Sequence, residues 1–146
     1  MCLKTKKGEY FRAKEDITCY KVVYLVGRKK WTGSFSYSNK EFEFDVVLKE
    51  TTGKPKVVKS YNPFEKEKEV YVELNGGYFH SCFTKERCET LLGRSKSKRK
   101  YYGLPARKEN FAICQCTIPK GTVYYEDGYS GEYASRKIIV HKPKKL

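Results

Sequence analysis

Apolar side chains occur along the chain in short runs, a pattern that predicts a protein built mainly from β-strands. The run 17–26 is rich in β-branched and aromatic residues and stops at Gly27, so it predicts a first strand of about ten residues. Large apolar residues recur at even spacing from Phe35 to Phe44, which indicates one or two more strands. Later strands are predicted at 57–58, 70–74, 78–83, 111–118, 123–125 and 138–140.

One short helix is predicted near 84–92. Thr84 is a suitable N-cap, Glu86 falls in the positively polarised first turn, and Gly93 is placed to end the helix. The apolar residues at helical spacing are Cys88, Leu91 and Leu92. The expected fold is therefore mainly β (α+β), an antiparallel sheet or partly closed barrel with one helix packed against it.

Length and composition favour one folded domain over residues 1–146. The chain has 39% apolar and 15% aromatic residues, too many for an intrinsically disordered basic tail. Its apolar runs are far shorter than a bilayer span, and its start lacks the apolar segment of a signal peptide. We therefore expect a cytoplasmic protein that does not associate with membranes.

The net charge of +14, from 31 Lys and Arg against 17 Asp and Glu, predicts a polyanionic partner. The densest cationic stretch is 94–108, which carries no carboxylate and is expected to form a mobile surface loop after Gly93. A second short basic segment is the tail 142–146. Cations next to aromatic rings suit phosphate contact and base stacking, and the candidates are Arg99, Lys100, Tyr101, Tyr102, Arg107, Lys108, Arg28, Lys30 and Trp31. The alternative is a solvated lysine-rich surface whose aromatic rings pack inward.

Six cysteines in a chain without an export signal are expected to be reduced core residues. A zinc site would have to combine His80, Cys82, Cys88, Cys114 and Cys116. The spacing is unfavourable, because Cys114 and Cys116 fall in a β-patterned run rather than on a knuckle turn. We therefore expect no metal and no cofactor.

Five segments in a fixed order suggest a family. They are MCLKTKKGE, DITCYKVV, GYFHSC, CTIPKGTVYYED and GEYASRKIIV. In these segments the chain resembles a family of small uncharacterised proteins of tailed phages and prophages of gut bacteria. The resemblance implies a phage setting, with the protein in the cytoplasm of the infected host, and a β-rich fold. It transfers no catalytic residue, and the segment 94–108 is not part of the shared pattern.

In a phage setting, the leading hypothesis is a non-catalytic sponge that sequesters an anionic nucleotide of a host defence system. The segment 131–136 is expected to be a turn that contacts such a ligand, with Arg136 and Ser135 on phosphate and Tyr133 over a base. His80 is placed with them as a pocket residue. The structural alternative pairs Arg136 with Glu132. Since sponges often bind between subunits, a homo-oligomer is also expected.

Two other classes stay open. The first is nucleic-acid binding by the same basic residues. No helix-turn-helix, zinc-finger or RNP pattern is present, so this binding is expected to lack sequence specificity. An enzyme, in the form of a nucleotide-cofactor-dependent transferase, would use His80 as a general base, Ser81 or Cys82 as a nucleophile, and Glu132 as a partner. Catalysis is the less favoured reading.

Overall fold

In the computed structural model, strands are the main secondary structure of the described residues, and all of the strand pairings are antiparallel. The structure describes residues 2–5, 10–27, 29–33, 41–49, 56–60, 69–73, 78–101, 103, 107–128 and 130–143. The strands are β1 (Cys2–Thr5), β2 (Phe11–Arg12), β3 (Ile17–Leu25), β4 (Lys30–Gly33), β5 (Phe42–Glu43), β6 (Val47–Lys49), β7 (Lys56–Ser60), β8 (Glu69–Glu73), β9 (Phe79–Cys82), β10 (Phe111–Ile118), β11 (Val123–Asp127), β12 (Glu132–Ser135) and β13 (Lys137–Val140). The helices are α1 (Lys85–Tyr101) and a single 3-10 turn, Lys108–Asn110.

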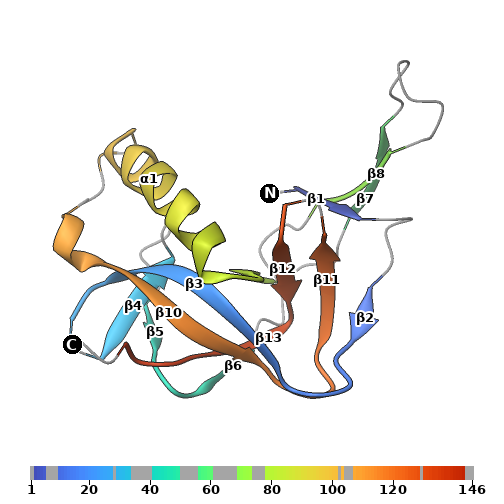
Figure 1. The fold of residues 1–146 in the computed structure, drawn as a ribbon, viewed down its shortest axis with the longest axis horizontal. Coiled ribbons are helices and arrows are strands. Elements are labelled where there is room, and N and C mark those ends of the chain that lie inside the picture. The colour runs from blue at the N-terminus through green and yellow to red at the C-terminus, as the bar shows by residue number, and fades with distance from the viewer. Residues whose placement is uncertain are drawn as a thin grey trace.

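Two sheets are formed (Figure 1), and the larger one carries the main core. Its strand order is β2-β11-β12-β9-β3-β10-β13-β6. Off this path, β4 pairs with β3, and β5 pairs with β4. The smaller sheet has the order β1-β8-β7. Among the described strands, no pairing joins β2 to β6, so this sheet is not closed and the barrel stays a prediction.

Strands β3 and β10 form the centre of the larger sheet and are paired along their length, from Phe111 opposite Tyr24 to Ile118 opposite Ile17. Both follow the sequence expectation closely, because each combines β-branched and aromatic residues with a clear Gly or Pro boundary. Four other strands, β1, β2, β4 and β12, were not expected. Residues 132–135 were expected to lie in a ligand-contacting turn, and they form β12 instead.

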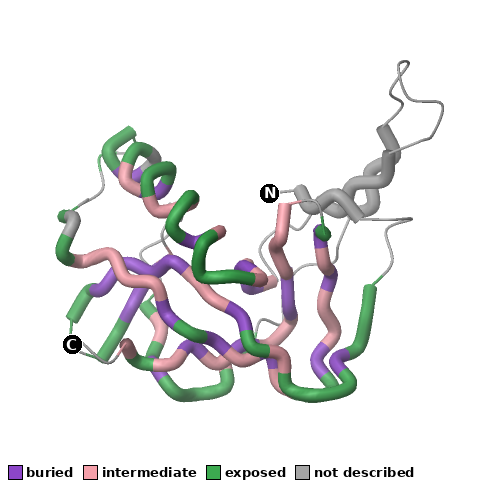
Figure 2. The backbone as a smooth tube through the Cα atoms, viewed as in Figure 1, coloured by how far each residue is buried: buried purple, intermediate pink, exposed green. Residues whose placement is uncertain are grey.

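The main core lies on one face of β3 and β10, where buried residues follow both strands (Figure 2). Alternate residues face it, as the two-residue period of a strand requires. Its fully or nearly buried members are Cys19, Val23, Leu25, Trp31, Phe44, Phe79, Cys114, Cys116, Ile118, Ile138 and Val140.

The opposite face of the same strands is covered by α1. Thr84 caps this helix, since its Oγ accepts a hydrogen bond from the Arg87 amide at 3.3 Å. Below the helix, Cys88, Leu91 and Leu92 pack on residues of β3, β9 and β10. No helix in the described ranges is long and apolar enough to span a bilayer.

The helix is longer than predicted. It continues through Gly93 for two further turns and ends at Tyr101. Residues 94–101 of the expected basic loop are therefore helical. Gly93 has no left-handed backbone conformation here, so it does not act as a helix stop.

Candidate functional site

The basic segment occupies the second half of α1. Arg94 and Lys100 are exposed, Lys96 is half-buried, and Tyr101 is 82% exposed at the helix end. Arg107 is exposed beyond it. Cations at a helix C-terminus also interact favourably with the helix dipole, so part of this charge has a structural explanation.

Arg99 differs from its neighbours because its side chain points into the protein. The residue is only 5% exposed, and its guanidinium carbon lies 3.8 Å from the centre of the Tyr24 ring. Tyr24 in turn packs edge-on against Phe111, with ring centroids 5.1 Å apart. Burial lowers the pKa of Arg99. Arg99 therefore fixes the end of α1 to β3 and β10 and is not displayed on an open surface.

The second cationic and aromatic group, near residue 30, is also divided by the fold. Trp31 is 1% exposed and stacks on Phe42 in the core, at a ring distance of 4.8 Å. Lys30 is exposed and lies 3.7 Å from a carboxylate oxygen of Glu41. Arg28, Tyr102 and the side chain of Lys108 lie outside the described residues.

The segment 131–136 does not form the expected ligand-contacting turn. Because β12 is a strand, Tyr133 and Ser135 face one side of the sheet, while Arg136, next after the strand, lies on the other. Ser135 is fully buried, and Tyr133 packs on Phe83 at a ring distance of 4.3 Å. The ion pair expected between Arg136 and Glu132 is not formed. Glu132 lies 3.7 Å from Arg87 instead.

Arg136 instead sits on a row of aromatic rings. Its guanidinium carbon lies 4.4 Å from the centre of the Tyr78 ring. Tyr78 meets Tyr125 edge-on at 5.7 Å, and Tyr125 meets Tyr10 edge-on at 6.3 Å. Burial, and then the neighbouring Tyr78, raise the pKa of Tyr125. We call these four residues, Arg136, Tyr78, Tyr125 and Tyr10, the arginine–tyrosine row.

His80 lies on the same face as Arg136, since it pairs with Ala134 in the register of β9 and β12. Its Nδ1 is sealed from solvent and has no hydrogen-bond partner within the described ranges. Burial, followed by the charge of Lys21, lowers the pKa of His80 to about 3. The imidazole is therefore neutral at pH 7 and adds no positive charge to this face.

Lys21 is an unusual member of the core face of β3. Its Nζ donates a hydrogen bond to the backbone oxygen of His80 at 2.6 Å and lies 5.9 Å from the centre of the Trp31 ring. Burial lowers the pKa of this amine. The bond to His80 links β3 to β9 next to their shared register pair, Tyr20 with Cys82.

Five cysteines are buried free thiols, namely Cys19, Cys82, Cys88, Cys114 and Cys116. Cys19 lies opposite Cys116 in the register of β3 and β10, and the contact lowers the pKa of Cys19 and raises that of Cys116. Cys82 and Cys88 form a second hydrogen-bonded pair. Within the part of the chain that the structure describes, no group of three or more His, Cys, Asp or Glu residues is arranged to hold a metal ion.

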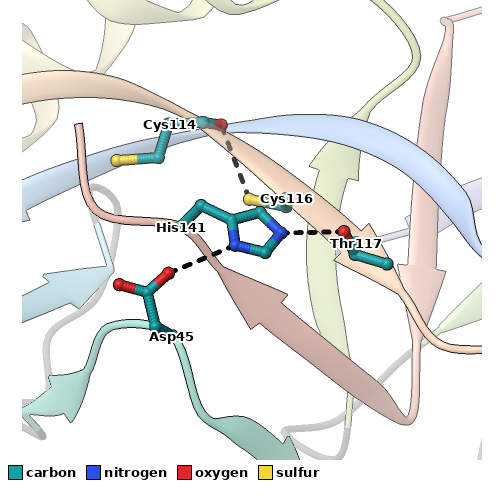
Figure 3. Close-up of polar contacts among 5 residues, drawn as sticks. All are labelled: Asp45, Cys114, Cys116, Thr117 and His141. Carbon is teal, nitrogen blue, oxygen red and sulfur yellow. Dashed lines mark hydrogen bonds and ion pairs between the residues drawn. The ribbon is translucent and has the colours of Figure 1, made fainter. Parts of the chain in front are cut away.

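One polar group was missed by the sequence analysis. Oδ1 of Asp45 lies 3.2 Å from Nδ1 of His141, and Nε2 of the same ring lies 2.8 Å from Oγ of Thr117 (Figure 3). The three residues are far apart in the chain and have no motif spacing. Only the pairing of β6, β13 and β10 brings their segments together. A sequence signal for this group was limited to the rarity of histidine, since the chain has two.

Comparison with known proteins found no matching family model, no matching curated protein and no matching solved structure. The resemblance to phage proteins therefore stays a prediction.

Proposed function

We propose that the protein binds an anionic nucleotide at the arginine–tyrosine row. The observation that supports this proposal most strongly is the contact of the Arg136 guanidinium with the face of Tyr78, at 4.4 Å. This contact orients the cation through its flat side. The N–H groups on its edge stay in the plane in which a phosphate is bound by two parallel hydrogen bonds.

Charge supports a phosphate at this position. Within the described residues, no carboxylate forms an ion pair with Arg136, while Glu132 is engaged with Arg87. His80 on the same face is neutral, so it does not compete with the arginine for the anion. The net charge of +14 favours the approach of an anion from solution.

The base of the nucleotide would stack at the other end of the row. Tyr10 is 62% exposed, while Tyr125 behind it is buried and holds it edge-on. A rigid aromatic ring with one open face is suited to stacking on a base of any identity. In this arrangement Arg136 determines the preference for phosphate, and Tyr10 contributes affinity with little base specificity.

The mode of action that we propose is sequestration. Tyr125 lies in β11, and Arg136, Tyr78 and Tyr10 lie directly next to the ends of β12, β9 and β2, so little ordering is needed when a ligand binds. Binding without chemical change is consistent with the earlier hypothesis of a sponge for a host defence nucleotide, and the phage setting of that hypothesis rests on the sequence resemblance.

A second candidate function is loose binding of nucleic acid along α1. Arg94 and Lys100 lie on the exposed surface of the helix, and Tyr101 at its end is exposed as well. These side chains can contact a phosphate backbone and an unpaired base. Such binding is strongly salt-dependent, because it depends on several phosphate contacts.

Native mass spectrometry of the purified protein, with its ultraviolet absorbance ratio, tests the proposal. A discrete nucleotide adduct of defined mass is the expected result. Heterogeneous nucleic acid that is removed by high salt would favour the α1 surface instead. A protein that stays without ligand after incubation with AMP, cyclic di-AMP and a short oligonucleotide at low salt would refute both.

A further inference from the structure

The network of Asp45, His141 and Thr117 has the bonding order of a catalytic triad. A carboxylate oxygen contacts one ring nitrogen at 3.2 Å, and a hydroxyl contacts the other at 2.8 Å. In the tautomer that carries its hydrogen on Nδ1, the His141 ring donates a hydrogen bond to the Asp45 carboxylate. The lone pair of Nε2 then faces the Thr117 hydroxyl. From this geometry we propose that Thr117 is an acyl-accepting nucleophile and that the protein hydrolyses small activated esters.

Backbone hydrogen bonds hold Asp45 and His141 in place. The amide of Asp45 donates to the Val140 carbonyl at 2.9 Å, and the amide of His141 donates to the Gln115 carbonyl at 3.0 Å. Asp45 also has a φ of 59°, in the left-handed region that non-glycine residues rarely adopt. A backbone conformation of this kind, maintained next to a histidine and a hydroxyl, is typical of functional sites.

The nucleophile lies on the face of β10 that points away from the main core. Cys116 and Ile118 on either side of Thr117 are buried, while Thr117 itself is half-buried and Gln115 is exposed. Gln115 and Thr117 are two residues apart on one strand, so their side chains share that face. In the proposed mechanism, the Gln115 amide is the group on this face that donates a hydrogen bond to the oxyanion formed when a carbonyl is attacked.

The chemical step balances within these groups. Oγ of Thr117 forms a bond to the ester carbonyl carbon while its proton passes to Nε2 of His141. The bond from carbon to the alcohol oxygen then breaks, and the leaving alcohol takes that proton from Nε2. A water molecule, deprotonated by the same nitrogen, releases the carboxylic acid and restores Thr117. Because Asp45 and His141 are both partly exposed, the site is open to small substrates.

The experiment uses the full chain and p-nitrophenyl acetate. The wild-type protein is expected to hydrolyse it, with an acetyl group on Thr117 after acid quenching, located by tandem mass spectrometry. Thr117→Val is expected to lower kcat/KM by about a hundredfold or more, and Thr117→Ser to retain activity. Asp45→Asn and His141→Gln should lose activity without removing the nucleophile.

Thr18 provides the matched control, because it lies directly opposite Thr117 in the register of β3 and β10 and is exposed. Thr18→Val should keep the wild-type rate. Equal rates for wild type and a folded Thr117→Val protein would overturn the proposal, as would acetylation confined to lysines and thiols. The site shares no residue with the arginine–tyrosine row, so either proposal can fail without the other.

Discussion

The guanidinium carbon of Arg99 lies 3.8 Å from the centre of the Tyr24 ring, and this contact joins the end of α1 to the sheet. It changes the role expected for the basic segment. A residue that the sequence assigns to phosphate binding is instead a structural cation, buried at the interface between the helix and β3.

Arg99→Ala is expected to destabilise the protein by about 2 kcal/mol, since a desolvated cation–π contact and the packing of the aliphatic stem are both lost. Chemical denaturation measures this change. Lys100→Ala removes one charge from the exposed side of the same helix turn and should change stability by less than about 0.5 kcal/mol. Equal effects of the two substitutions would show that Arg99 does not contribute through the Tyr24 contact.

The low pKa of His80 predicts a loss of stability in mild acid. The unfolded chain binds a proton at His80 near the ordinary value of 6.5, whereas the folded protein does so only near 3. Between these values the unfolded state holds more protons, so stability falls as the pH falls, by up to about 1.4 kcal/mol per pH unit.

Unfolding free energies measured from pH 6.5 to 5 test this relation. His80→Gln should flatten the dependence in this range, because the glutamine does not titrate. The matched change His141→Gln leaves His80 in place and should keep the downward slope. A wild-type protein with constant stability over this range would contradict the burial of the His80 ring.

The cysteines should be inert in the folded protein. Burial is the reason: Cys19, Cys88 and Cys116 are fully buried, and Cys82 and Cys114 are nearly so. Burial also raises the pKa of Cys114 to about 12. Hydrogen bonds from Cys116 and Cys88 lower the pKa of Cys19 and Cys82, but these two thiols are closed to a reagent in the folded protein as well. In a Cys2→Ser background, a thiol reagent such as DTNB is expected to react slowly at pH 8 and stoichiometrically in guanidinium chloride. Rapid labelling of the folded protein would argue against the thiol packing described above.

Arg136→Gln is expected to weaken nucleotide binding by about tenfold to a hundredfold, because a charge-assisted hydrogen bond pair to phosphate is lost. Tyr10→Ala should weaken it by about tenfold through the loss of stacking. Isothermal titration calorimetry with the nucleotide found by mass spectrometry gives both values. Arg107→Gln removes the same charge from an exposed position and should have a small effect, and a larger effect there than at Arg136 would move the site to the basic segment.

Strands with clear patterns could be predicted from the sequence, and the residues that they bring together could not. β10 follows the expected range closely because its apolar run ends at Pro119. β12 was mistaken for a turn because Glu132–Ser135 is short, has mixed polarity and follows two glycine-containing turns. That error placed Tyr133, Ser135 and Arg136 on one surface, whereas a strand separates them.

The C-terminal half of α1 could not be predicted from the sequence either. Its apolar spacing ends at Leu92, and the next inward positions are Ser95 and Arg99, which no hydrophobic pattern detects. Ser95 satisfies its hydroxyl within the helix by donating to the Leu91 carbonyl at 2.9 Å, and Arg99 is stabilised by a tyrosine from β3. Both depend on contacts that exist only after the helix has packed on the sheet.

Nuclear magnetic resonance of the protein with labelled arginine Nε and tyrosine rings, titrated with AMP and cyclic di-AMP, tests the proposed nucleotide site most directly. If the nucleotide binds at the arginine–tyrosine row, the largest shifts occur at the Arg136 Nε–H group and at the rings of Tyr10 and Tyr78, and they saturate at a fixed stoichiometry. Shifts confined to Arg94 and Tyr101, or no shift with either nucleotide, would contradict binding at this row.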